Sequence, residues 1–178
     1  MTDNEYLQKI LADQTLKEDG PELKALREER AAVETLLRDE FADYNPTIRY
    51  GGSKAKGTMV RESYDLDIPC YFENEDDDAG TSLEDVFDNT RKALEKKYIV
   101  TPKTSALRLL NSSGQTRGTY VHVDVVPGRF TDEKKKDCYL HVSNGDKTRL
   151  KTNLDVQIAH IRDSGWCESI RLSKLWKV

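Results

Sequence analysis

The sequence predicts an α+β fold, in which helices pack against a β-sheet. Three features of the chain support this prediction. Apolar side chains recur at helical spacing through residues 1–46, and residues 64–72 and 120–126 alternate apolar and polar side chains with the two-residue period of strands. Between those two strands, a segment at 82–98 returns to helical spacing. The 178 residues are enough for one sizeable domain.

Two helices open the chain. Apolar residues from Tyr6 to Leu11 share one helical face, and Gly20-Pro21 breaks this helix and starts another. The second helix carries an apolar stripe from Leu23 to Phe41 until Asn45-Pro46 stops it. We expect both helices to serve as scaffold.

Strands and helices then alternate along the chain. The expected elements are a strand at 47–50, a helix beginning near Lys54, a strand at 64–72, a helix at 82–98 capped by Ser82, a strand at 104–110, a turn at 111–118, a strand at 120–126 ended by Pro127-Gly128, a strand at 138–142 and a helix at 153–162 capped by Asn153. A last helix begins at Cys167, and its apolar face is incomplete at the end of the sequence. We therefore expect a further lobe or a partner to cover it.

The composition excludes several classes of protein. No apolar run is long enough to span a membrane and the N-terminus is acidic, so a cytoplasmic protein without a membrane partner is expected. Three widely spaced cysteines support neither a disulfide framework nor a zinc site. A net charge of -4 gives no general attraction for nucleic acid, so a nucleic-acid activator would need a local basic face.

Three aspartates indicate the chemistry. Asp65 and Asp67 lie on the same face of one strand, about 6.6–6.8 Å apart along it, so both can reach a shared cation. Asp124 lies on the polar face of a later strand and completes the set if the two strands are neighbours. Three converging carboxylates repel one another unless hard cations neutralise them, and oxygen ligands select Mg²⁺ or Mn²⁺. Two such ions, roughly 3.5–4 Å apart, catalyse phosphoryl transfer.

A glycine turn precedes the acidic strand. Gly51-Gly52-Ser53 allows backbone N–H groups to approach phosphate oxygens closely, and Ser53 can donate its hydroxyl. Lys54 and Lys56 follow within one turn and could add positive charge, although lysines there are as readily solvated. Each motif alone is common, but the glycine turn, the acidic strand and the third aspartate seldom coincide in this order.

Several other polar residues have an ordinary explanation. The acidic run at 75–78 is typical of a solvated loop. His122 shares a face with Asp124 and could contact substrate, but a histidine there is more often a structural neighbour of the carboxylate. Arg108, Arg117 and Arg129 could line a cleft, with a surface position as the default.

The motifs resemble those of the nucleotidyltransferases related to DNA polymerase β. That signature is G-[GS], a spacer, D-h-[DE]-h and a third acid on a later strand, and here it is Gly52-Ser53, residues 65–68 and Asp124. Within the superfamily, the stretches 51–58, 63–68, 123–127 and 170–176 are most similar to the oligoadenylate synthase and cyclic GMP-AMP synthase branch. Its bacterial members are the CD-NTases.

This resemblance implies an architecture. We expect a polymerase β-like core with a mixed sheet flanked by helices, divided into an N-terminal helical scaffold (1–46), a nucleotidyltransferase core (47–165) and the start of a truncated C-terminal helical lobe (166–178). Members of the family continue into a larger helical lobe that closes the cleft and holds the base. On this basis, turnover by the truncated chain is uncertain.

The resemblance also implies roles for individual residues. Asp65 and Asp67 would bind both metal ions, Mg²⁺ or Mn²⁺, and Asp124 would bind the catalytic ion and help to activate the acceptor hydroxyl. Gly52 and Ser53 would contact the donor phosphates, and Lys174 matches a lysine that contacts the triphosphate in that branch.

The implied activity joins ATP, GTP or other nucleoside triphosphates into a cyclic or linear oligonucleotide second messenger and releases pyrophosphate, in bacterial defence against phage. Two alternatives stay open. The same chemistry could act on a tRNA end or a protein hydroxyl, or the chain could be a catalytically silent nucleotide-binding fragment.

Overall fold

The computed structural model describes residues 1–75, 77, 79–111 and 122–176. The helices in these ranges are α1 (Asp3–Asp13), α2 (Pro21–Glu40), α3 (Gly52–Lys56), α4 (Leu83–Glu95), α5 (Leu154–Arg162) and α6 (Cys167–Leu175). The strands are β1 (Thr47–Ile48), β2 (Asp65–Phe72), β3 (Tyr98–Pro102), β4 (Leu107–Asn111), β5 (His122–Phe130), β6 (Cys138–His141) and β7 (Arg149–Thr152).

The strands form one mixed sheet. Its main path runs β1-β2-β5-β4-β3, and β6 pairs with both β5 and β7. β2 and β5 are parallel neighbours, whereas the other pairs are antiparallel. The α+β fold class with a mixed sheet flanked by helices is therefore confirmed.

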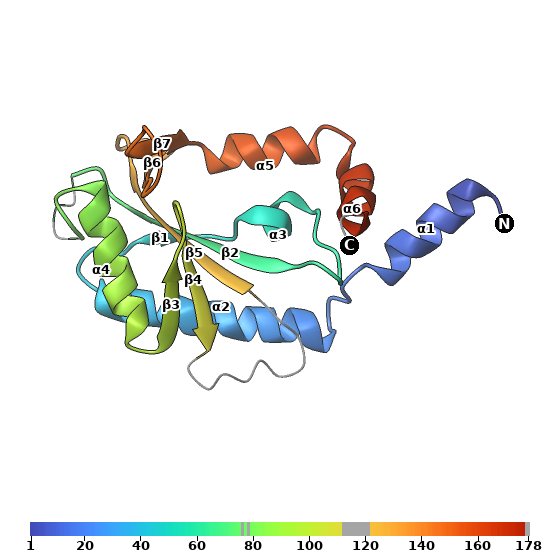
Figure 1. Cartoon of the computed structure of the whole chain (residues 1–178), viewed down its shortest axis with the longest axis horizontal. Coiled ribbons are helices and arrows are strands. Elements are labelled where there is room, and N and C mark those ends of the chain that lie inside the picture. Colours follow the sequence, from blue (N-terminus) through green and yellow to red (C-terminus); the bar gives the residue numbers. More distant parts are fainter. Residues whose placement is uncertain (76, 78, 112–121, 177–178) are drawn as a thin grey trace.

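The two faces of this sheet differ in polarity. Leu66 and Ile68 of β2 and Val125 of β5 are fully buried in a core that also contains Val33 and Leu37 of α2. Figure 1 shows α2 running below the strands, with α3 and α5 above them. Because alternate side chains of a strand point to opposite faces, the aspartates of β2 and β5 lie on the face away from this core.

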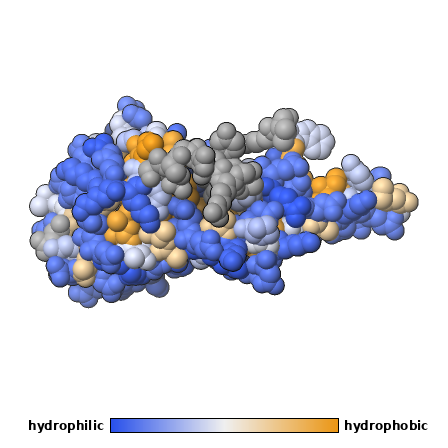
Figure 2. Space-filling model, turned by 90° about the horizontal axis from the view of Figure 1, so that it is seen from below, coloured by the Kyte–Doolittle hydropathy of each residue, from blue (hydrophilic) through white to orange (hydrophobic). Residues whose placement is uncertain are grey.

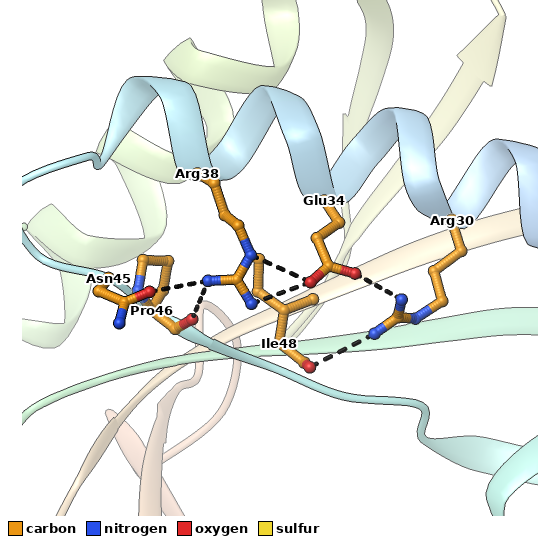
Figure 3. Close-up of polar contacts among 6 residues, drawn as sticks. All are labelled: Arg30, Glu34, Arg38, Asn45, Pro46 and Ile48. Atoms are coloured by element: carbon orange, nitrogen blue, oxygen red, sulfur yellow. Dashed lines mark hydrogen bonds and ion pairs between the residues drawn. The ribbon is translucent and has the colours of Figure 1, made fainter.

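A polar network ties α2 to the chain that leads into the glycine turn (Figure 3). Glu34 accepts hydrogen bonds from Arg30 and from Arg38, whose Nε lies 3.0 Å from its Oε1. Arg38 also donates to Asn45 Oδ1 at 2.9 Å and to the Pro46 carbonyl at 3.3 Å, which secures the turn after α2. The network therefore anchors the segment that carries β1.

The surface is strongly polar, as a charged fraction of 34% requires. Figure 2 shows hydrophilic residues over most of one face, with apolar residues in separate small patches. No residue of α6 is buried, and Trp166 and Trp176 are 64% and 90% exposed. Among the described residues, no helix combines the length and the apolar composition that a membrane crossing requires.

Most expected elements are present, and the caps of two helices are confirmed. The side chain of Ser82 accepts a hydrogen bond from the backbone N–H of Asp85, and that of Asn153 accepts one from Val156. The strand expected at 47–50 covers only Thr47–Ile48, and the strand expected at 104–110 is Leu107–Asn111. The turn was expected at 111–118, but Asn111 belongs to β4, and the rest of that turn lies outside the described residues, as do the first two residues of the strand expected at 120–126.

Two strands were not predicted. The helix expected at 82–98 ends at Glu95, and the following residues form β3 because Tyr98, Ile99 and Val100 pair with β4. β7 pairs with β6 although its sequence, Arg-Leu-Lys-Thr, has only one apolar residue. Both strands are formed by pairing with another strand, and the local pattern of apolar residues does not reveal that pairing.

The expected end of a strand at Pro127-Gly128 was wrong, because β5 continues to Phe130. Pro127 is the register partner of Cys70, and Gly128 allows β6 to approach closely. A Cβ at Gly128 would lie 2.6 Å from the sulfur of Cys138 and 2.7 Å from Leu140. These residues extend the strand instead of ending it.

The buried stripe of α2 predicts a large stability cost for truncation at its centre. Leu37 has no exposed surface, so Leu37→Ala is expected to lower the free energy of unfolding by about 2–5 kcal/mol. Leu7 in α1 is 41% exposed, and Leu7→Ala is expected to cost less than about 1 kcal/mol. Urea unfolding followed by circular dichroism measures both values, and equal losses would contradict the assigned core.

Candidate active site

The parallel pairing of β2 with β5 brings the predicted aspartates together. Asp67 and Asp124 are register partners, and Asp65 is the partner of His122. Neighbouring strands are about 4.8 Å apart, so Asp67 and Asp124 lie side by side on the same face. Asp65 is two residues from Asp67 on that face and is exposed, whereas the other two are partly buried. Three carboxylates that are distant in sequence therefore share one side of the sheet.

The electrostatics of Asp67 reflect this crowding. Burial raises the pKa of its carboxyl, and the negative charges of Asp124 and Asp65 raise it further. The positive charges of Lys56 and Lys174 act in the opposite direction on the same pKa. The carboxylates and these two lysines are thus close enough to influence one another.

The glycine turn lies directly against Asp67. The Gly51 N–H donates to the Asp67 carbonyl at 2.9 Å, and Gly52 has a φ of 51°, in the left-handed region that favours glycine. A Cβ at Gly52 would lie 1.5 Å from Asp67 Oδ2. Only glycine permits this approach. On the other side, the guanidinium of Arg30 lies 4.4 Å from the ring centre of Tyr50, which supports the turn from α2.

The remaining predicted site residues lie around this turn. Ser53 and Lys54 are partly buried on α3, and the Ser53 carbonyl accepts from the N–H of Thr58 at 3.0 Å. Lys174 reaches across from α6 and donates from Nζ to the Thr58 carbonyl at 2.8 Å. Burial lowers the pKa of Lys174, while Asp65 and Asp67 act to raise it. On α3, Lys56 is the lysine whose charge acts on Asp67.

Arg108 is a site residue that the sequence analysis allowed to line a cleft but placed on the surface by default. Its Nε donates to Asp124 Oδ1 at 2.8 Å, and its Nη2 donates to Oδ2 at 2.7 Å. Arg108 is the register partner of Asp124 on the antiparallel strand β4. Alternation with the buried Leu107 and Leu109 is the sequence signal that places Arg108 on the polar face. That signal predicts a contact with Asp124 only once β4 and β5 are known to be neighbours.

Other polar residues discussed above lie elsewhere or contact the site weakly. His122 Nδ1 lies 3.8 Å from Asp65 Oδ1, beyond a hydrogen bond. Arg129 donates to the carbonyls of Gly80 and Thr81, and its Nη1 lies 3.8 Å from Asp77 in the acidic run. Residues 76, 78 and 117 lie outside the described ranges.

The donor set fits a hard divalent cation in chemical type. Carboxylate oxygens on two neighbouring strands are ligands that Mg²⁺ and Mn²⁺ accept. Both oxygens of Asp124 are engaged by Arg108, and within the described ranges no three acidic, histidine or cysteine side chains already surround a common point. The side chains that could hold a cation are therefore adjacent but not yet assembled around it.

No protein-family model and no curated protein matches the sequence. Solved structures, however, share the fold of this chain. CdnC of E. coli MS115-1 with ATP has a TM-score of 0.65 at 23% identity, covering 98% of this chain and 57% of that chain. The CD-NTase CdnG of Bradyrhizobium diazoefficiens, in complex with GTP, has a TM-score of 0.66 at 21% identity over 88% of this chain and 46% of that chain. This chain has the CD-NTase fold.

A third structure with this fold is the cyclic AMP-GMP synthase DncV of Vibrio cholerae with nonhydrolyzable GTP. Its TM-score is 0.54 at 16% identity, covering 85% of this chain and 46% of that chain. The chain thus spans about half the length of the CD-NTase structures that it matches. At these identities the likeness concerns the fold.

The close approach of the turn predicts that Gly52 cannot be replaced. Gly52→Ala combines an unfavourable φ with a collision against Asp67, so we expect loss of Mn²⁺ and nucleoside triphosphate binding. Gly57 also has a positive φ, 72°, but a Cβ there would meet nothing within 4 Å. Gly57→Ala therefore controls for backbone strain. It should lower the free energy of unfolding by about 1–2 kcal/mol and retain binding. Isothermal titration of both variants measures the difference, and equal binding would contradict the geometry.

The raised pKa of Asp67 predicts how stability changes with pH. The folded chain binds a proton at Asp67 more tightly than the unfolded chain, so the contribution of this group to stability is greatest at low pH and falls as pH rises through the folded pKa. Asp67→Asn removes the ionisable carboxyl and therefore the loss of stability that accompanies its deprotonation. In EDTA, we expect the variant to melt above the wild type near about pH 7 and close to it near about pH 3.

Thermal unfolding in EDTA at several pH values measures this effect. Asp88→Asn, a partly exposed carboxyl on α4, is the matched control and should show no such gain. A difference between Asp67→Asn and the wild type that stays constant with pH would contradict the assigned environment of Asp67.

Proposed function

We propose that this chain is the catalytic core of a metal-dependent nucleotidyltransferase that joins nucleoside triphosphates into a cyclic or linear oligonucleotide second messenger and releases pyrophosphate. The observation that supports this most directly is the in-register pair of Asp67 and Asp124, with Asp65 on the same face and the glycine turn against Asp67. The matched structures include a cyclic AMP-GMP synthase, and others were determined with ATP or GTP. The motif resemblance suggests a role in bacterial defence against phage.

The residues divide the reaction between them. Asp65, Asp67 and Asp124 would hold Mg²⁺ or Mn²⁺, which when bound would neutralise phosphate charge and lower the pKa of the attacking hydroxyl. The glycine turn at Gly51 and Gly52 would contact phosphate oxygens, and Ser53 would donate its hydroxyl to them.

Positive side chains of the same region would attract the triphosphate. Lys174 and Lys56 lie close enough to the carboxylates to affect the pKa of Asp67, and Lys54 is on the same short helix as Lys56. In the transfer, the acceptor oxygen forms a bond to the α-phosphorus, the bond to pyrophosphate breaks and the hydroxyl proton is released. The role of the chain is to align these groups.

The acceptor distinguishes this proposal from its alternatives. The protein should be incubated with Mg²⁺ or Mn²⁺ and labelled nucleoside triphosphates, with and without RNA. A small phosphatase-resistant product supports an oligonucleotide signal. Labelled RNA or labelled protein would identify a macromolecular acceptor, and absence of any product would identify a silent nucleotide-binding module.

Removal of two carboxylates tests the assigned chemistry. Asp65→Asn combined with Asp67→Asn should reduce product formation by more than about 100-fold, because even residues behind the metal ligands typically contribute about 10- to 100-fold. The fold should remain, since neither side chain belongs to the core. Asp88→Asn serves as a matched control with normal activity. Unchanged product formation in the double variant would refute the metal assignment.

A further inference from the structure

Arg108 and Asp124 form a complete two-point contact at the centre of the candidate site. Both carboxylate oxygens accept a hydrogen bond from the guanidinium, at 2.8 and 2.7 Å. The Asp124 side chain is 14% exposed and that of Arg108 is 26% exposed, so water screens the pair only partly. A contact of this kind is stronger than an ordinary surface ion pair.

The strand register makes this contact a property of the fold. β5 lies between β2 and β4, and the row across the three strands is Asp67, Asp124, Arg108. Asp124 therefore has a carboxylate on one side and a guanidinium on the other. Without Arg108, Asp124 and Asp67 would be two partly buried negative charges side by side, which is unfavourable.

Positive groups already act on the three carboxylates in the absence of a cation. Asp65, Asp67 and Asp124 contribute three negative charges, and Arg108, Lys56 and Lys174 supply three positive charges that act on the same groups. Arg108 differs from the two lysines because it occupies both oxygens of one carboxylate. A divalent cation that approaches Asp124 meets a positive charge that already holds its ligand atoms.

We propose that Arg108 is a positioning residue that serves as the internal counter-ion of Asp124, holding this carboxylate in place until a divalent cation competes for its oxygens. The inference rests on the proposed function, in which Asp124 binds such a cation. Arg108 therefore stabilises the metal-free chain and weakens its affinity for the cation. Metal affinity and metal-free stability should change in opposite directions when Arg108 is replaced.

Binding of Mn²⁺ alone tests this inference without recourse to activity. The signal of free Mn²⁺ in electron paramagnetic resonance gives its dissociation constant for the whole chain, and thermal unfolding in EDTA gives the metal-free stability. For Arg108→Gln, we expect Mn²⁺ to bind at least about 5-fold more tightly, because a competing positive charge is lost. The same variant should melt below the wild type in EDTA and gain more from added Mn²⁺.

Matched variants make the result specific. Arg91 pairs with Asp88 and Glu95 on α4, and Arg91→Gln should leave the Mn²⁺ affinity unchanged. Arg108→Lys keeps the charge but cannot donate in the two-point geometry, so its affinity should lie between those of the wild type and Arg108→Gln. If Arg108→Gln does not fold in EDTA, the lysine variant carries the test.

The outcomes separate this inference from the proposed function. Equal or weaker Mn²⁺ binding in folded Arg108→Gln, or in Arg108→Lys if only that variant folds, overturns the role of Arg108. In that case, the metal assignment is retained if the wild type binds Mn²⁺ and Asp124→Asn does not. If the wild type binds no Mn²⁺, or if Asp124→Asn binds as the wild type does, the metal assignment fails and this inference fails with it.

Discussion

The parallel pairing of β2 with β5 is the constraint on which the candidate site depends. It aligns Asp67 with Asp124, although 56 residues lie between them in the sequence, and it turns both side chains to the same face. A slip of one residue would send one of the two aspartates into the apolar core. The apolar partners on the opposite face, such as Leu66, Ile68 and Val125, oppose that slip because they fill the core beside α2. Core packing and site assembly are therefore two results of one register.

The glycine turn is supported from the helical side. α2 contributes Arg30, which lies over Tyr50 immediately before the turn, and Arg38, which secures the turn at Asn45 and Pro46. Glu34 lies between these two arginines and accepts from both. Through these contacts, α2 supports the segment that enters the turn. Residues without any catalytic chemistry influence where the backbone of Gly51 and Gly52 lies.

The parts of this structure that the sequence predicted are those whose signals are local. Alternation in residues 64–72, the helical stripe of α2, and the caps Ser82 and Asn153 each depend on neighbouring residues, and the acidic strand and glycine turn have a recognisable spacing. β3 was missed because Tyr98 continues the apolar stripe of α4, and β7 was missed because its pairing with β6 is its main support. The end of β5 was misplaced because Gly128 accommodates a neighbouring strand, a contact that no local pattern shows. Arg108 required the sheet order itself.

The contact between Gly52 and Asp67 joins the glycine turn to the carboxylates of the candidate site. The turn that would receive the triphosphate lies directly against a side chain that would receive the cation, and a shift of Gly52 toward β2 would displace the Asp67 carboxylate. Ligands that share such a contact influence each other's affinity, and the influence is reciprocal. Nucleotide and cation are therefore expected to bind cooperatively, because the nucleotide would fix the turn that touches Asp67 and the cation would fix the carboxylate that touches the turn.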